Sequence, residues 1–134
     1  MQISRKLVVI VSLVATVIVG VAFTKPIVSQ DKRNLKVLPK DISEEALDKI
    51  MDDFEKDLGV KCDFCHAPQK DNASKLDYAS DEKPEKEISR AMMTMTIDIN
   101  KKYFEVKNAM IGDSTLAVNC NTCHHGDPHP EAKH

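Results

Sequence analysis

The feature that most constrains this chain is a short Cys-x-x-Cys-His motif that occurs twice. The first copy is Cys62-Asp63-Phe64-Cys65-His66 and the second is Cys120-Asn121-Thr122-Cys123-His124, so the two copies use all four cysteines. In this motif the thiols add to the vinyl groups of a c-type haem, and the histidine that follows is placed to bind the iron. The sequence therefore predicts two covalently bound haem c groups. The predicted attachment residues are Cys62, Cys65, Cys120 and Cys123, and the predicted proximal iron ligands are His66 and His124.

Three other uses of paired cysteines explain the pattern less well. A zinc ribbon with four cysteine ligands has about 15–20 residues between its pairs, whereas Cys65 and Cys120 lie much further apart. A thioredoxin-like redox pair requires a βαβ pattern, which the sequence does not show. Two structural disulfides would give the histidines no role.

The first 30 residues predict an export segment. They contain basic but no acidic residues, and an apolar run extends from Leu7 to Phe23. A run of this length lies at the lower limit for spanning a bilayer. We expect it to be kept as a membrane anchor with the amino terminus in the cytoplasm, and cleavage after Gly20-Val21-Ala22 is the alternative. In both cases the rest of the chain would lie on the periplasmic side of a bacterial inner membrane.

Charge and composition limit what the rest of the chain can do. The chain has 21 acidic and 19 basic residues, and the acidic excess is larger beyond residue 30. This balance gives no indication of nucleic-acid binding. An acidic surface would suit redox partners, a donor and an acceptor, with basic docking surfaces, but solvated helix faces explain the acidic excess at least as well. Residues 31–41 are polar and predict a linker, which leaves 42–134 as a dihaem domain. With four phenylalanines, two tyrosines and no tryptophan, this domain has few large apolar side chains, and two porphyrins would enlarge its core.

A first helix is predicted after Ser43, a residue typical of a helix N-cap, and it should end at Gly59. Apolar residues recur between them at helical spacing: Leu47, Ile50, Met51, Phe54 and Leu58. Met51 lies on this apolar face ahead of the first motif, where it could bind the iron of the first haem. From spacing alone, a distal ligand and an ordinary core methionine explain Met51 equally well.

A second helix is predicted to begin at Pro84, after a polar surface loop at 67–83. Its apolar stripe consists of Ile88, Ala91, Met92, Met95 and Ile99. Met92 and Met95 share this face, so either could meet the second iron while the other packs on the ring. Met110, in a turn, is a poorer candidate. Ligation by His125 or His129 stays an alternative, although we expect both to be exposed or close to propionates.

These features together resemble one dihaem half of the four-haem cytochrome c subunit of photosynthetic reaction centres. The resemblance extends from Asn34 to Pro130. It rests on Asn34-Leu35-Lys36-Val37-Leu38, Leu58-Gly59, Arg90-x-Met92-x-x-Met95-Thr96-x-x-Ile99-Asn100 and Cys120-Asn121-Thr122-Cys123-His124-x-Gly126-x-Pro128. The resemblance implies that Met51 is the distal ligand of the first haem. It also implies Met92, in preference to Met95, as the distal ligand of the second.

The chain also departs from that family. The family subunit has two such halves, and a histidine between its second methionine helix and second motif ligates a haem of the other half. Residues 103–109 of this chain contain no histidine, so we expect His/Met ligation at both irons. Two copies of the chain could pair to restore a four-haem assembly. The family has arginine where this chain has His125, so docking to a reaction centre is not implied.

Iron bound by histidine and methionine has no open coordination position, which favours electron transfer over substrate activation. We therefore expect a small, mainly α-helical multihaem cytochrome c fold. A methionine-bearing helix, a turn and a Cys-x-x-Cys-His helix would be repeated twice around two haems. We expect an electron carrier between a membrane oxidoreductase and a periplasmic or membrane acceptor. The alternative is a dihaem enzyme, a peroxidase or a small-oxyanion reductase, with one open iron.

Overall fold

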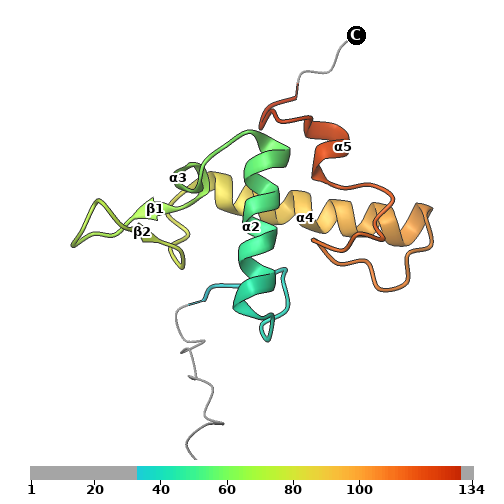
Figure 1. The fold of residues 1–134 in the computed structure, drawn as a ribbon, viewed down its shortest axis with the longest axis horizontal. Helices are drawn as coiled ribbons and strands as arrows, with labels where there is room; N and C mark the ends of the chain where they lie inside the picture. Colours follow the sequence, from blue (N-terminus) through green and yellow to red (C-terminus); the bar gives the residue numbers. More distant parts are fainter. Residues whose placement is uncertain (1–32, 131–134) are drawn as a thin grey trace, which may run out of the picture. The chain divides into compact units, whose positions relative to one another are not determined.

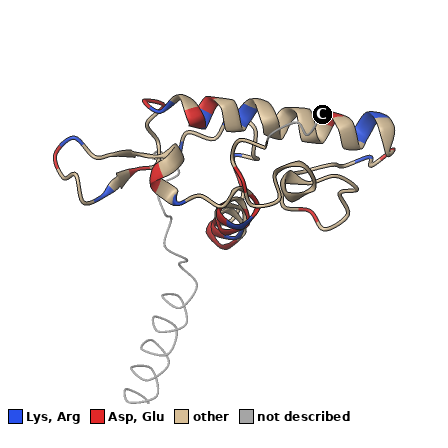
Figure 2. Ribbon diagram, turned by 90° about the horizontal axis from the view of Figure 1, so that it is seen from above, with Lys and Arg blue, Asp and Glu red and all other residues tan. Residues whose placement is uncertain are grey.

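Two long helices that cross one another form the framework of the protein (Figures 1 and 2). The computed structural model describes residues 33–130, so the predicted export segment at 1–30 lies outside the described residues. The helices are α2 (Glu44–Leu58), α3 (Cys62–Cys65), α4 (Pro84–Tyr103) and α5 (Cys120–His124). The short helices α3 and α5 lie on opposite sides of α2 in both views. The described part of the chain is mainly helical, which confirms the predicted fold class.

Local signals in the sequence account for both ends of α2. The Ser43 Oγ accepts a hydrogen bond from the Ala46 backbone nitrogen at 3.2 Å, as an N-cap residue does. Glu44 and Glu45 lie in the first turn, where the helix dipole favours negative charge. Gly59 ends the helix in a left-handed conformation with φ of 65°. The predicted first helix is therefore confirmed at both ends.

The buried face of α4 is mostly polar. It carries Lys86, Arg90, Met93, Thr96 and Asn100, among which Met93 is the one hydrophobic side chain. The apolar stripe predicted from the sequence lies on a different, solvent-exposed face of the same helix. Its large members Ile88, Met92 and Met95 are 56%, 43% and 47% exposed. This helix therefore buries polar groups and leaves apolar ones uncovered, the reverse of an ordinary surface helix.

The hydrophobic core is small and joins four parts of the chain. Leu38 from the segment before α2, Ile50 from α2, Met93 from α4 and Ile111 from the loop before α5 are all buried together. Partly buried side chains pack around this group, and Met51 is among them. The core therefore fixes the crossing of α2 and α4, on which both Cys-x-x-Cys-His motifs depend.

A small hairpin replaces part of the surface loop predicted at 67–83. Strands β1 (Ala67–Pro68) and β2 (Leu76–Asp77) pair in antiparallel fashion, with Ala67 opposite Asp77. Between them, the Asn72 side chain accepts a hydrogen bond from the Ser74 backbone nitrogen at 3.1 Å. Two-residue strands are too short to give an alternating pattern in the sequence, so the prediction of an irregular loop was wrong at these positions.

Candidate haem-binding sites

The first motif forms α3 and is tied to both long helices. The Cys62 backbone nitrogen and Sγ both donate to Oε1 of Glu55 on α2, each at 3.1 Å. The Cys65 Sγ lies 3.7 Å from the Ser89 Oγ on α4. Because each thiol contacts a different helix, the position of α3 is set by the crossing of α2 and α4.

His66, which follows α3, has the properties of a metal-binding histidine. Its Nδ1 is buried and has no hydrogen-bond partner among the described residues. Burial lowers the pKa of His66, and the nearby charges of Lys86 and Arg90 lower it further. The imidazole is therefore favoured in its neutral form, the form that binds metals. The Tyr78 ring packs edge-on against it, with ring centroids 5.0 Å apart.

The second motif forms α5, and its cap and its histidine are both ordered by hydrogen bonds. Asn119 and Thr122 make a reciprocal capping box at the start of the helix. At the other end, Nδ1 of His124 lies 2.8 Å from the backbone oxygen of Asp127. A carbonyl oxygen can only accept, so Nδ1 must carry the proton and Nε2 is left free for a metal.

A close contact between two glycines holds α5 against α2. The Gly126 backbone nitrogen donates to the Asp57 backbone oxygen at 2.9 Å. A Cβ added at Gly59 would come within 2.1 Å of the Gly126 oxygen, so a side chain has no room there. The left-handed φ of Gly59 also favours glycine. Both glycines belong to stretches that carried the resemblance, and the structure gives their physical role.

Three of the four thiols differ from those of redox-active cysteine pairs. All four cysteines are free. A hydrogen bond with Glu55 raises the pKa of Cys62, and burial raises the pKa of Cys65 and Cys120. Reactive Cys-x-x-Cys pairs instead depend on a lowered thiol pKa. Within residues 33–130, no three His, Cys, Asp or Glu side chains are placed to share a metal ion.

The three candidate methionines lie in two different settings. Met51 is half-buried and packs against the hydrophobic core. Met92 and Met95 are both exposed on α4. Helix α3 packs against α4, whereas α5 packs against α2. In the chain α3 follows α2 and α5 follows α4, so each attachment helix packs on the other long helix. That Met51 and His66 bind the same iron stays a prediction.

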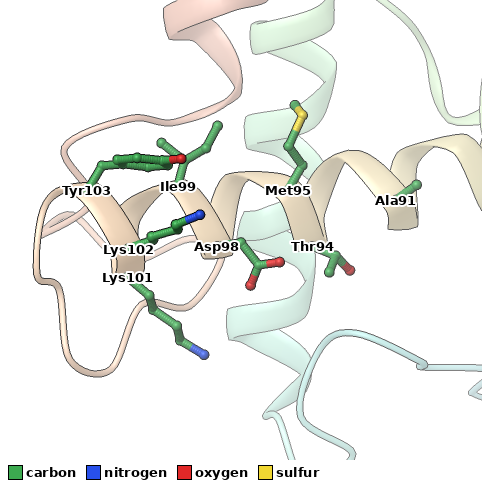
Figure 3. Close-up of a pocket in the computed structure, with 8 residues that line it drawn as sticks. All are labelled: Ala91, Thr94, Met95, Asp98, Ile99, Lys101, Lys102 and Tyr103. Atoms are coloured by element: carbon green, nitrogen blue, oxygen red, sulfur yellow. The ribbon is translucent and has the colours of Figure 1, made fainter.

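A shallow, open hollow lined by α4 residues follows the exposed stripe of that helix (Figure 3). One side is lined by Ala91, Met95, Ile99 and Tyr103, which repeat every four residues along the helix, and the other by Thr94, Asp98, Lys101 and Lys102. Met95 lines this hollow, whereas Met92 does not. An apolar strip with lysines beside it suits a flat, hydrophobic ring that carries carboxylates.

A second, smaller hollow of about 260 Å³ opens beside the attachment residue Cys120. Phe54 and Ile50 of α2 form part of its wall, together with Ile111 and Leu116 from the chain before α5. The thiol of Cys120 therefore lies next to space with a partly apolar lining.

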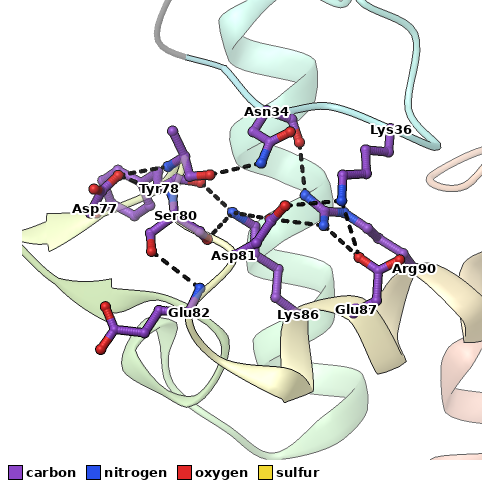
Figure 4. Close-up of polar contacts among 11 residues, drawn as sticks. Asn34, Lys36, Asp77, Tyr78, Ser80, Asp81, Glu82, Lys86, Glu87 and Arg90 are labelled. Carbon is purple, nitrogen blue, oxygen red and sulfur yellow. Dashed lines mark hydrogen bonds and ion pairs between the residues drawn. The ribbon is translucent and has the colours of Figure 1, made fainter.

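A charged cluster fixes the loop after β2 to α4 (Figure 4). The Arg90 guanidinium lies 2.8 Å from the Asp81 carboxylate and donates to the Asn34 backbone oxygen at 2.9 Å. The Lys86 Nζ donates to the Tyr78 backbone oxygen at 2.7 Å. Because the Tyr78 ring packs on His66, this cluster also supports the first proximal histidine.

Three residues that support the motifs were missed in the sequence. Glu55 and Tyr78 contact the first motif only through the tertiary fold, and no local pattern indicates it. The Asn100 Oδ1 accepts hydrogen bonds from the Ala117 and Val118 backbone nitrogens, just before the second motif. Asn100 differs from the other two residues because it belongs to a stretch on which the resemblance rests. Its position was therefore marked in the sequence, but its contacts were not.

The residues of both motifs fit a covalently bound haem. Each motif has free thiols and a histidine. In His66, Nδ1 has no hydrogen-bond partner among the described residues, and in His124, Nε2 is left free for a metal. The uncovered stripe of α4 supplies the apolar surface that a porphyrin would bury.

A family model for the photosynthetic reaction centre cytochrome c subunit matches residues 6–133. The chain belongs to this family. No curated protein and no solved structure matches it. Membership makes the chain a haem-bearing cytochrome c of the electron-transfer class, in a family associated with the periplasmic side of the membrane. Among residues 33–130 of this cytochrome, no helix is both long and apolar enough to cross a bilayer.

Proposed function

We propose that this cytochrome binds two haem c groups and carries electrons between a membrane oxidoreductase and a periplasmic or membrane acceptor. The observation that carries the proposal is the shared construction of the two motifs. Each is a short helix held against a long one, with free thiols and a histidine nitrogen available for iron. Two complete attachment sites in one chain support two haems.

The proposed roles of the site residues follow their chemistry. Cys62 and Cys65 hold the first haem and Cys120 and Cys123 hold the second. His66 and His124 bind the two irons from the proximal side. Met51 is proposed as the distal ligand of the first iron and Met92 as that of the second. The hollow lined by Met95 supports keeping Met95 as the alternative to Met92.

The bound haem supplies the redox chemistry, a one-electron change at iron. The protein supplies position and surroundings. The Asp127 carbonyl orients the His124 ring through Nδ1, which also raises the basicity of Nε2, the nitrogen that would bind iron. A methionine sulfur bound to the iron would exclude small molecules from it and raise its potential. The chain would then exchange electrons without opening either site.

Absorption spectra of the purified, haem-loaded protein test this function. We expect two haems per chain, the weak far-red band of sulfur-ligated oxidised iron, and no change when carbon monoxide is added to the reduced protein. A carbon monoxide shift in about half of the haem would indicate one open iron and favour the dihaem enzyme, a peroxidase or small-oxyanion reductase. A haem content of one per chain would contradict the dihaem proposal.

The proposal also includes a location and an assembly. The segment 1–30 would hold the protein at the periplasmic face of the inner membrane. Two copies would pair so that four haems form one path, as in the subunit that the sequence resembles. Sedimentation equilibrium of the haem-loaded protein in detergent tests the pairing, and a monomer at high concentration would contradict it.

A further inference from the structure

Glu55, near the end of α2, is a carboxylate that directly contacts the first attachment residue. Its Oε1 accepts hydrogen bonds from the backbone nitrogen and from the Sγ of Cys62, each at 3.1 Å. The Glu55 side chain is 30% exposed, so protein covers most of it. Its ion-pair partner is Lys61, whose Nζ lies 3.9 Å from Oε2 and whose side chain is 84% exposed. A partner so exposed neutralises the carboxylate only weakly, which leaves a negative charge beside Cys62.

This contact does not depend on the thiol proton of Cys62. Cys62 is the first residue of α3, so its backbone N–H has no acceptor within that helix, and the side chain of the N-cap residue Lys61 makes no capping hydrogen bond. Glu55 provides the acceptor from α2. The backbone N–H remains when Cys62 becomes a thioether, and the sulfur is bonded to the same residue. The carboxylate therefore stays close to the thioether and to the edge of a ring attached there.

Capping of α3 does not by itself require a charged group. At α5 the N-terminus is capped by the side chain of Asn119, a neutral amide. A carboxylate differs from an amide in its effect on a nearby iron. Fe(III) haem carries one more positive charge than Fe(II) haem, so a carboxylate beside it stabilises the oxidised state. A glutamate with an ordinary pKa is ionised at neutral pH, so this charge is present there.

We propose that Glu55 lowers the reduction potential of the haem at the first motif through its negative charge. This inference rests on the proposed function, in which the chain carries electrons one at a time. The redox donor gives one electron, Fe(III) becomes Fe(II), and no bond or proton at Glu55 changes. Glu55 binds no iron. It is a positioning residue, which holds a charge beside Cys62 and so sets how readily the first haem is reduced.

The test is an equilibrium redox titration of the haem-loaded, full-length protein at pH 7, followed by absorption. Glu55→Gln keeps an acceptor for the Cys62 backbone nitrogen and removes the charge. At the wild-type midpoint potential of the first haem, we expect its ratio of reduced to oxidised form to rise several-fold, while the ratio for the second haem changes less than twofold. Titration of a chain that combines Cys120→Ala with Cys123→Ala, and so holds haem at the first motif only, assigns the two potentials.

Three further variants separate charge from structure. Glu45→Gln is the matched control, since Glu45 is exposed in the first turn of the same helix, roughly 15 Å from Glu55 along its axis, and it should move neither potential. Glu55→Asp keeps the charge on a shorter side chain, so its ratio should lie closer to wild type than that of Glu55→Gln. Lys61→Gln removes the partner charge and should shift the first haem in the opposite direction, toward its oxidised form. If Glu55→Gln yields no stable protein, Lys61→Gln decides.

Several outcomes would overturn the inference. An unchanged first potential in Glu55→Gln would show that the charge has no effect, and equal shifts of both potentials would show a general disturbance. A shift in Glu55→Asp with none in Glu55→Gln would leave Glu55 as a cap of α3 only. Where Lys61→Gln decides, a first haem that is unchanged or more readily reduced would count against the charge. A wild-type chain without haem on its Cys62–Cys65 peptide, seen by mass spectrometry before any variant is made, would instead refute the proposed function.

Discussion

Met92 and Met95 lie one turn apart on the exposed stripe of α4, and their exposed fractions, 43% and 47%, are nearly equal. The sequence resemblance favours Met92 as the second distal ligand, whereas the hollow along α4 is lined by Met95. Substitution decides between them. We expect Met92→Ala to leave both haems attached, to let about half of the reduced haem bind carbon monoxide, and to lower one midpoint potential, because a thioether stabilises reduced iron.

The comparison is Met110→Ala, since Met110 is the poorer candidate from the sequence and is also exposed, at 41%, but lies outside α4. It should change neither the spectrum nor the potentials. A spectrum altered by Met95→Ala and untouched by Met92→Ala would assign the ligand to Met95 instead.

Gly59 combines a left-handed φ of 65° with the close approach of the Gly126 oxygen. We expect Gly59→Ala to lower the free energy of unfolding of the haem-loaded protein by more than the roughly 1–2 kcal/mol that a left-handed non-glycine residue costs. Gly126→Ala is the control, because φ there is also positive, but the added Cβ meets its nearest atom only at 3.9 Å. Denaturant titration compares the two. Equal losses of unfolding free energy in Gly59→Ala and Gly126→Ala would mean that the close approach of the two glycines adds no cost to a side chain at Gly59.

At the scale of elements, the loop after β2 is held to α4 by charge. The pKa of the Asp81 carboxyl lies well below its usual range, first because Lys36 hydrogen-bonds to it and then because Asn34 and Arg90 do. Its ionised form is therefore favoured by folding. That stabilisation is complete above the unfolded-state pKa of about 4 and is lost as the pH falls below it toward the folded-state pKa.

Asp81→Asn should therefore lower stability at pH 7, and the difference from wild type should shrink as the pH falls below about 4. Denaturant titrations between neutral and acidic pH measure this difference. Asp71→Asn, in the exposed tip of the hairpin, serves as the control. Equal free energies of unfolding for Asp81→Asn and wild type at neutral pH would show that the charge cluster does not stabilise the fold.

The uncovered stripe of α4 gives a prediction for the helix as a whole. If haem covers this face, Met92 and Met95 should react with a mild methionine oxidant several-fold more slowly than Met110 in the haem-loaded protein. The three side chains are exposed to a similar degree in the structure, so Met110 is an internal reference. Peptide mass spectrometry over a time course gives the three rates. Equal rates would mean that no porphyrin covers the stripe.

The sequence predicts some elements of this fold better than others, for physical reasons. The ends of α2 follow from Ser43 and Gly59, whose effects are local, and the attachment motifs follow from chemistry that needs fixed spacing. The polar burial of Asn100 depends on Ala117–Val118, which are distant in the chain, so no periodic pattern indicates it. The two-residue strands of the hairpin are likewise set by side-chain contacts in their loop.

At the scale of the whole described unit, the two motifs lie on opposite sides of α2 but are not independent (Figures 1 and 2). The chain after α5 reaches back to the first motif, where the His129 ring packs edge-on against Phe64 with centroids 6.2 Å apart. Together with the contact of α5 on α2, this fixes both attachment helices in one frame. Such a fixed frame would suit electron exchange between two haems, because the position of each haem would not change when the other is oxidised or reduced.

Residues 1–30 should decide where this frame is held in the cell. If residues 1–30 anchor the protein, haem staining of the full-length chain should follow the membrane fraction and resist a high-salt wash, because apolar insertion is insensitive to ionic strength. A version in which a cleavable export signal replaces residues 1–30 should release the same haem into the periplasmic fraction. Haem from the wild-type protein found in the periplasmic fraction, on a chain shortened by residues 1–30, would show that the segment is removed. The carrier would then reach its partners by diffusion, with its acidic surface directing the encounter.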